Sequence, residues 1–323
     1  MKPNLLPRLL AVLAANVVLA SAASAAPHGI FWARGARPTP PVGSEAAGKV
    51  LYYGGPVISH AKVIAVFWGA SVAAETQSKI GPFYANMLDS TYMDWLNEYA
   101  TNVTAVDGRK GTNQTIGRGS YAGSVTITPA NTATDLTDAM VQAELDAQIA
   151  AGKLPPADAD SLYMIYFPAG VSISIEGQKS CSSFCAYHEG FKSARSGANV
   201  YYGVMPVCGF GCGVGGSTFD SLTVVSSHEC IEAVTDPFPT PGDSPAYPQA
   251  WNDPKGQEIG DLCASGNSTV TGHGITSQVQ WEWANSSNAC AQGPWSQNAA
   301  PAVFASPLFD AVRAVPASVF AGR

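Results

Sequence analysis

Charged residues are scarce in this chain, and extended basic runs are missing. Asp, Glu, Lys and Arg make up 13% of the 323 residues, and the formal net charge at pH 7 is −7. A protein that binds nucleic acid or an anionic membrane surface needs a concentration of positive charge. The composition therefore argues against both kinds of partner.

Long apolar runs are also missing after the first residues. Lys2 and Arg8 accompany a short apolar run at residues 9–20, and Ala23-Ser24-Ala25 has the small-residue pattern of a cleavage site. The run is too short for a membrane span and has the organisation of a secretory signal peptide. We predict a signal peptide at residues 1–25 and a secreted product, extracellular or periplasmic. A retained N-terminal anchor is the alternative.

Seven cysteines in an exported chain suggest three disulfides and one unpaired thiol. Cys230 is the expected odd one, because a buried free thiol behaves as a small hydrophobe. Cys181 with Cys185, and Cys208 with Cys212, form two close-spaced clusters. Local pairs and pairs crossed between the clusters both remain open. A structural zinc site on these four residues is the less favoured alternative.

Strand and helix patterns alternate over residues 60–205. Strands are predicted at 63–68, 124–128, 161–167 and 200–205, and helices within 75–99 and at 133–151. This alternation predicts an α/β or α+β fold with a mixed sheet flanked by helices. A single catalytic-type domain is expected over 49–295. A Pro/Gly-rich linker or pro-segment at 26–48 precedes it, and an Ala/Pro-rich C-terminal tail at 296–323 follows.

The stretch Ser-His-Glu-Cys-Ile-Glu at 227–232 carries the most specific chemistry. Residues four apart lie on one face of a helix, so His228 and Glu232 can hold one metal ion. Glu229 then lies beside the ion as a general base. This is the arrangement of the zinc-protease helix His-Glu-x-x-His, with a carboxylate in place of the second histidine.

The sequence also predicts both ends of this zincin-like helix. Ser217 with Asp220 has the spacing of a capping box, and Pro237 ends the helix. His228 and Glu232 should therefore lie in its last two turns.

A zinc site needs a third protein ligand and an open position for water. Glu258 and Asp261 are the best downstream candidates, and His188, beside the first cysteine cluster, is a further one. A ligand set with two carboxylates is also compatible with calcium or manganese. We predict zinc, because a histidine on a His-Glu helix suits it, with structural calcium as the alternative.

Several motifs between about residues 50 and 290 support a family resemblance. They are Leu-Tyr-Tyr-Gly-Gly-Pro-Val at 51–57, Phe-Trp-Gly at 67–69, the cysteine segments 181–188 and 208–212, Val-Thr-Asp-Pro at 234–237, and the segments 258–263 and 283–290. With them the chain resembles the Exordium-like, or phosphate-induced, secreted proteins. It is similar to bacterial members that keep the His-Glu-x-x-Glu motif.

This resemblance implies an extracellular protein, linked in plants to cell-wall and growth responses. It implies pairing of Cys263 with Cys290. It brings no settled biochemical activity, but the motif retained here implies an active metallohydrolase branch.

Two functions from different classes follow. The first is a secreted zinc-dependent metallopeptidase that hydrolyses peptide bonds in a protein or peptide substrate. The second is a non-catalytic module that binds cell-wall polysaccharide or a surface partner, with Trp251, Trp281, Trp283 and Trp295 stacking on sugars. Ordinary core packing is the competing interpretation of these tryptophans.

Overall fold

The structure is a computed structural model that describes residues 29–36, 49–209, 212, 216–239 and 244–297. The predicted signal peptide at 1–25 lies outside these residues, as does all of the predicted tail after residue 297. Within the described ranges, no helix has both the length and the apolar character needed to cross a membrane.

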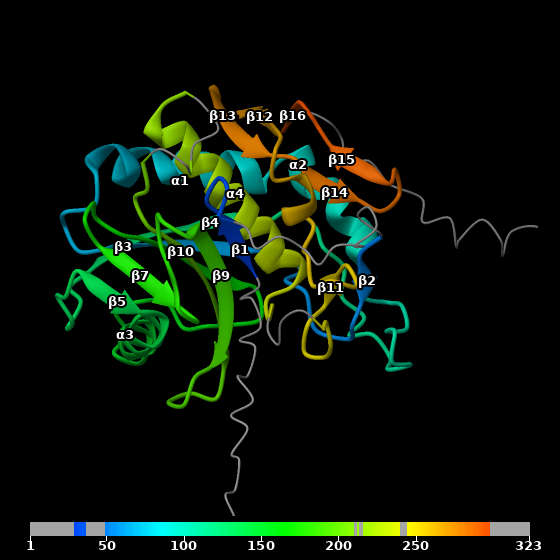
Figure 1. The fold of residues 1–323 in the computed structure, drawn as a ribbon, viewed down its shortest axis with the longest axis horizontal. Helices are drawn as coiled ribbons and strands as arrows, with labels where there is room; N and C mark the ends of the chain where they lie inside the picture. Colours follow the sequence, from blue (N-terminus) through cyan, green and yellow to red (C-terminus); the bar gives the residue numbers. More distant parts are fainter. Residues whose placement is uncertain (1–28, 37–48, 210–211, 213–215, 240–243, 298–323) are drawn as a thin grey trace, which may run out of the picture.

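A six-stranded mixed sheet in the order β1-β9-β10-β6-β3-β4 forms the centre of the molecule (Figure 1). Strands β10, β6, β3 and β4 are parallel, whereas β9 runs antiparallel to β10, and β1 runs antiparallel to β9. The strands are β1 (Ile30–Trp32), β3 (Lys62–Trp68), β4 (Ser120–Ile127), β6 (Ser161–Tyr166), β9 (Phe184–Lys192) and β10 (Asn199–Met205). The predicted α+β class with a mixed sheet is confirmed.

Helices cover both faces of this sheet (Figure 1). They are α1 (Ala74–Leu88), α2 (Thr91–Asp94), α3 (Asp138–Ala150) and α4 (Thr218–Thr235), with the 3₁₀ turns η1 (Trp95–Tyr99) and η2 (Asp261–Cys263). Val63 of β3 belongs to the apolar cluster shared with α1 and α4, and Ile64 belongs to the cluster shared with α3. Because successive side chains of a strand point to opposite faces, α3 lies across the sheet from α1 and α4. The continuous burial of β3 after its first residue follows from this double cover.

Short strands complete the fold, most of them after α4. They are β2 (Leu51–Tyr52) paired with β11 (Trp251–Asn252); β12 (Asn267–Gly272) between β13 (Ile275–Gln280) and β16 (Trp295–Ser296); the hairpin β14 (Glu282–Ala284) and β15 (Ala289–Ala291); and β5 (Asp135–Thr137), β7 (Ser172–Ile175) and β8 (Gln178–Lys179). Strand β13 packs on α4, which also contacts β6, β9 and β10 of the central sheet. Helix α4 therefore lies between two layers of strands.

Helix α4 has the predicted ends and an unusual degree of burial. The Ser217 side chain accepts from the Asp220 N–H, and the Asp220 side chain accepts from the Ser217 N–H, so the capping box is present. Every residue from Thr223 to Thr235 is buried. A helix buried all round is normally apolar, yet this stretch holds a histidine and two glutamates. Their polar atoms must be satisfied inside the protein.

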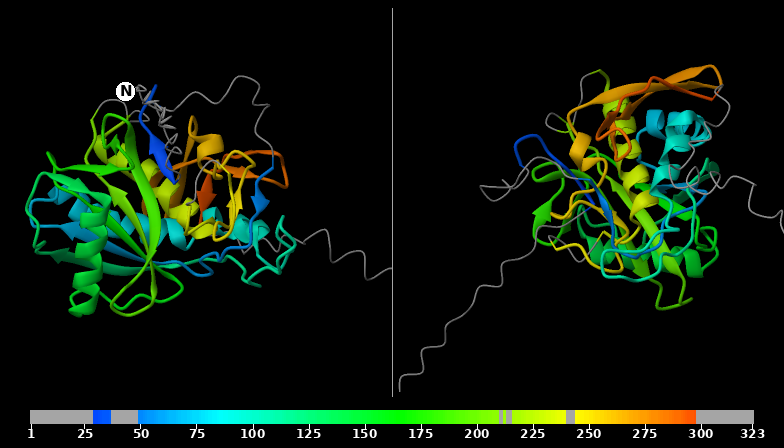
Figure 2. Two further views of the ribbon diagram at one scale, coloured as in Figure 1. Left: turned by 60° about the horizontal axis from the view of Figure 1, so that its bottom comes forward. Right: turned by 90° about the vertical axis from the view of Figure 1, so that its right-hand side faces the viewer.

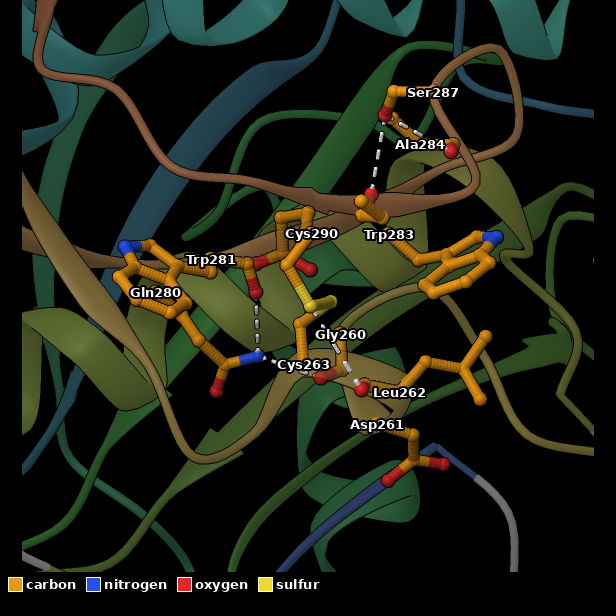
Figure 3. The surroundings of a disulfide bond; sticks show 12 residues. Gly260, Asp261, Leu262, Cys263, Gln280, Trp281, Trp283, Ala284, Ser287 and Cys290 are labelled. Carbon is orange, nitrogen blue, oxygen red and sulfur yellow. Dashed lines mark hydrogen bonds between the residues drawn. A yellow bond between two sulfur atoms is a disulfide. The ribbon is translucent and has the colours of Figure 1, made fainter. Parts of the chain in front are cut away.

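Three disulfides are present, and two of them are crossed between the cysteine clusters. They join Cys181 to Cys208, Cys185 to Cys212 and Cys263 to Cys290, and Cys230 is free and buried, as predicted. The alternative of a four-cysteine zinc site is wrong, because all four sulfur atoms are used in disulfides. The Cys263–Cys290 bond ties η2 to the hairpin of β14 and β15 (Figure 3).

Part of the segment predicted as a linker is structured. Residues 26–48 were expected to lie outside the core, but Ile30–Trp32 form β1 on the edge of the central sheet. Three apolar residues pair with β9 here, and so short a strand leaves no periodicity to detect. The predicted C-terminal tail likewise starts too early, because Trp295–Ser296 pair in parallel with β12. The helix predicted at 133–151 begins at Asp138, after β5 and the Thr137 cap.

The Ser217 cap provides the first testable prediction. Ser217→Ala removes the acceptor for the Asp220 N–H, 3.0 Å away, and should lower the free energy of unfolding by about 1 kcal/mol. Ser221→Ala, one turn further along, is the matched control and should be neutral or slightly stabilising, because Ala is the better helix former. Denaturant unfolding of both variants measures the difference. Equal destabilisation of the two would show that the cap contributes nothing specific.

Candidate metal centre

The last two turns of α4 face β9 and the segment around η2, and the predicted site residues meet there. His228, Glu229 and Glu232 come from α4, His188 comes from β9, and Glu258 precedes η2; all five side chains are 0% exposed. Asp261, the first residue of η2, is half-buried. Five strongly polar side chains removed from water must neutralise one another or bind a cation.

His228 is oriented through Gln280, the last residue of β13. The Gln280 amide nitrogen donates to the carbonyl oxygens of Gly260 and Trp281 (Figure 3). This leaves the amide oxygen of Gln280 as the acceptor for His228 Nδ1, 3.2 Å away. With its proton on Nδ1, the imidazole presents a lone pair on Nε2. Metal-binding histidines are commonly held in this way, by an acceptor on their other nitrogen.

Glu232 lies between the two histidines. Its Oε1 accepts the backbone N–H of Asp261 at 2.9 Å. Its Oε2 lies 3.0 Å from His228 Nε2 and 3.8 Å from His188 Nδ1. Neither His228 Nε2 nor Glu232 Oε2 makes a hydrogen bond of normal geometry. Two acceptor atoms at 3.0 Å repel each other unless a proton or a metal ion neutralises them.

His188 repeats this pattern on the other side of Glu232. Its Nε2 lies 3.0 Å from the carbonyl oxygen of Asp236, which can only accept, so the proton belongs on Nε2. Its Nδ1 faces Glu229 Oε2 at 3.2 Å. Two groups of side chains therefore have the spacing of metal ligands, namely His228, Glu232 and Asp261, and His188, Glu229 and Glu232. Glu232 belongs to both groups.

Further buried carboxylates surround the pair. Both oxygens of Glu258 lack a hydrogen-bond donor, and Oε1 lies 3.5 Å from His188 Nε2. Glu282 Oε1 accepts from the Tyr92 hydroxyl at 2.9 Å, but its Oε2 has no donor. Burial raises the pKa of Glu258 and of Glu282 well above the ordinary range. Their unsatisfied oxygen atoms are available to a cation.

The electrostatics of the cluster favour positive charge. Burial alone would lower the pKa of His228, but the carboxylates of Glu232 and Glu229 outweigh it and raise the pKa to about 10. Burial is likewise outweighed at His188, where Glu258 and Glu229 raise the pKa well above the ordinary value. The field that holds a proton on these imidazoles attracts a metal ion in the same way. The donor set of imidazole nitrogen and carboxylate oxygen suits zinc and other divalent ions.

The structure thus brings together every residue predicted for the site. It adds Gln280, Glu282 and Phe31, which sequence reasoning missed. Gln280 and Glu282 flank Trp281, and this spacing of two places one polar side chain after the other on one side of an extended chain. This polar pair, alternating with Trp281 and Trp283, was the available signal. Phe31 had none, because its contact with the site is purely tertiary.

Comparison of the chain with protein-family models, with curated proteins and with solved structures found no match in any of the three. The Exordium-like resemblance accordingly stays a prediction. The case for function rests on the site itself.

The Gln280 contact gives a prediction about metal affinity. Gln280→Leu removes the acceptor for His228 Nδ1–H and frees the imidazole to rotate, so metal affinity should fall by about 10- to 100-fold. Gln278→Leu is the matched control and should leave affinity unchanged, because among the described residues its side chain bonds Asn267, away from the site. Competition for zinc with a coloured chelator measures both. Equal affinities would mean that Gln280 does not position His228.

Gly260 is the second position that the site makes sensitive. A Cβ there would lie 2.5 Å from His228 Nδ1, 2.8 Å from Glu232 Oε1 and 2.9 Å from Glu282 Oε2. Gly260→Ala should therefore cost about 1–3 kcal/mol in stability, as overpacking does, and should also weaken metal binding. Gly209→Ala is the control, since a Cβ at Gly209 meets no atom within 4 Å. Unfolding curves with and without added zinc test the pair.

Proposed function

We propose that this protein is a secreted, zinc-dependent metallopeptidase. The proposal rests mainly on one contact. His228 Nε2 and Glu232 Oε2 lie 3.0 Å apart, are fully buried, and have no hydrogen-bond partner of normal geometry. Asp261 supplies the third ligand, because its carboxylate lies in the same group. Asp261 is also the half-buried member of this group, so water would reach a metal ion held there from its side.

The division of roles follows from the geometry. Bound zinc supplies a Lewis acid that lowers the pKa of a coordinated water toward neutrality. Glu229 follows His228 directly on α4 and acts as the general base that accepts the proton of this water. The raised pKa of His188 favours its doubly protonated form, in which Nδ1 donates to Glu229 Oε2 at 3.2 Å and holds the carboxylate in place. The disulfides support an oxidising compartment, in agreement with secretion.

A contact of Glu229 with a backbone amide favours peptide-bond hydrolysis. Its Oε1 accepts the backbone N–H of Phe31 at 3.1 Å. A base that returns its proton to the leaving amine must reach the amide nitrogen of the bond being cleaved. The same carboxylate oxygen thus binds an amide nitrogen of extended backbone in this chain.

Two substitutions test the assignment. Glu229→Gln keeps the shape but removes the base, so the rate of casein or peptide hydrolysis should fall by about 10²-fold or more, with zinc content retained. His228→Ala should lose both zinc and activity. Elemental analysis gives the metal content, and the exposed Glu75→Gln on α1 is the control. Loss of zinc in Glu229→Gln would instead make Glu229 a ligand in the group with His188. Metal-free, inactive wild-type protein would refute the proposal, and binding of calcium in place of zinc would favour the structural alternative.

The polysaccharide-binding alternative has weaker support. Trp251 and Trp283 are each 8% exposed, and Trp281 and Trp295 pack partly buried against the same core. The Trp295 ring stacks on Trp95 at 6.4 Å between centroids. Side chains engaged in this way do not offer an open face to a sugar. A pull-down with insoluble polysaccharide remains the direct measurement of that function.

A further inference from the structure

Strand β1 covers the candidate metal centre. Besides the bond from the Phe31 N–H to Glu229, the Phe31 ring makes a T-shaped contact with the His228 imidazole, with centroids 4.9 Å apart and planes at 86°. Strand β1, dark blue in Figure 2, contacts α4. The complete burial of the two histidines therefore depends in part on β1, the first strand of the described chain.

The backbone of β1 is bound as an added strand. Ile30 and Phe31 lie opposite Tyr187 and Ala186 in an antiparallel register. The His188 N–H donates to the Gly29 carbonyl oxygen at 2.9 Å, and the Ala33 N–H donates to the Ser183 carbonyl oxygen at 3.1 Å. Strand addition to an exposed sheet edge is a general mode of peptide recognition, in which main-chain bonds supply affinity and alternate side chains supply specificity.

The side chains of β1 alternate between the two faces of the sheet. Phe31 is buried in the apolar cluster that contains Ile231 of α4. Ile30 and Trp32 pack in the cluster on the other face. The position of Phe31 is therefore the one that faces the metal centre, and it is lined for a bulky apolar side chain.

We propose that β9 and the C-terminal half of α4 form a binding site for an extended peptide, and that Ile30–Trp32 occupy it as an intramolecular stand-in. The bound peptide runs antiparallel to β9, places a large aromatic or apolar side chain against His228, and presents the amide nitrogen of that residue to Glu229. This inference rests on the proposed function for its chemistry, but the binding site itself does not require catalysis.

The reaction at this site is hydrolysis of the amide bond preceding the aromatic residue. The oxygen of water bonds to the carbonyl carbon, and the bond from that carbon to the amide nitrogen breaks. Glu229 takes a proton from the water and delivers it to the departing nitrogen, leaving a carboxylic acid and an amine. The position of Phe31 thus selects a bulky apolar residue on the amine side of the cleaved bond. While β1 remains in place, it excludes the substrate.

Two neighbouring substitutions in the full chain separate this role from ordinary packing. Phe31→Ala removes the ring that covers His228, whereas Trp32→Ala removes a larger ring from the opposite face of the same strand. Diethyl pyrocarbonate labelling of His188 and His228 in chelated protein is read by mass spectrometry over a series of pH values. Because the reagent attacks the unprotonated imidazole, the pH series separates loss of the proton from access to the site. We expect at least fivefold faster labelling in Phe31→Ala and no comparable change in Trp32→Ala. Equal labelling rates in the two variants would overturn the proposal.

Peptide competition then tests the ligand. The synthetic peptide Gly-Ile-Phe-Trp-Ala-Arg, which copies residues 29–34, should protect both histidines of Phe31→Ala from labelling. The peptide with Ala in place of Phe should protect at least tenfold less well. Equal protection by the two peptides, or none, would contradict the assigned specificity. Near-ultraviolet circular dichroism confirms folding, and Phe31→Leu, which keeps most of the buried bulk, replaces Phe31→Ala if that variant does not fold.

The outcomes distinguish this inference from the proposed function. Selective peptide protection in a protein that binds no zinc and hydrolyses no peptide would support the peptide-binding site and refute the proposed peptidase activity. The opposite result is zinc-dependent hydrolysis with equal histidine labelling in wild type, Phe31→Ala and Trp32→Ala. It would support the proposed function and refute the role of β1 as occupant of the peptide site. Hydrolysis by Phe31→Ala at least tenfold faster than by wild type, with cleavage before aromatic residues, is the result expected if both hold.

Discussion

The shared carboxylate of Glu232 is the interaction on which the site depends. Its Oε2 lies 3.0 Å from His228 Nε2 and 3.8 Å from His188 Nδ1, with all three side chains fully buried. In water such a contact would be screened. In a dry interior it is tolerable only with protons or a metal ion to neutralise it. Protons and a metal ion would compete for the same atoms, so metal binding to this cluster should weaken as the pH falls.

The architecture serves to bury this cluster without letting it collapse. Helix α4 is held between the central sheet and β13, so its polar face cannot turn to solvent. Gln280 and the backbone N–H of Asp261 fix one atom each of His228 and Glu232. The Cys263–Cys290 disulfide attaches η2 to the β14–β15 hairpin and so holds this segment near α4. Strand β1 covers the remaining side, which links access to the site with the N-terminal segment.

Much of the fold was readable because its signals are local. The buried runs of β3 and β6, the capping box at Ser217 and the stop before Pro237 involve residues close together in the sequence. The ends of elements were less certain: Thr137 was expected inside a helix and instead caps α3. Strand β9 was missed altogether, because its alternation is interrupted by residues that belong to the disulfide cluster and to the candidate metal centre.

By itself the sequence determined which groups share one face of α4, since helical spacing alone places His228 beside Glu232, and it singled out Cys230 as the odd cysteine. The tertiary structure decided which strands complete the site. His188, Gln280 and Phe31 come from elements up to about 250 residues apart, and their meeting depends on strand order and register. The crossed disulfide pairs have the same origin. Such choices are set by the packing of the whole chain, which no local pattern encodes.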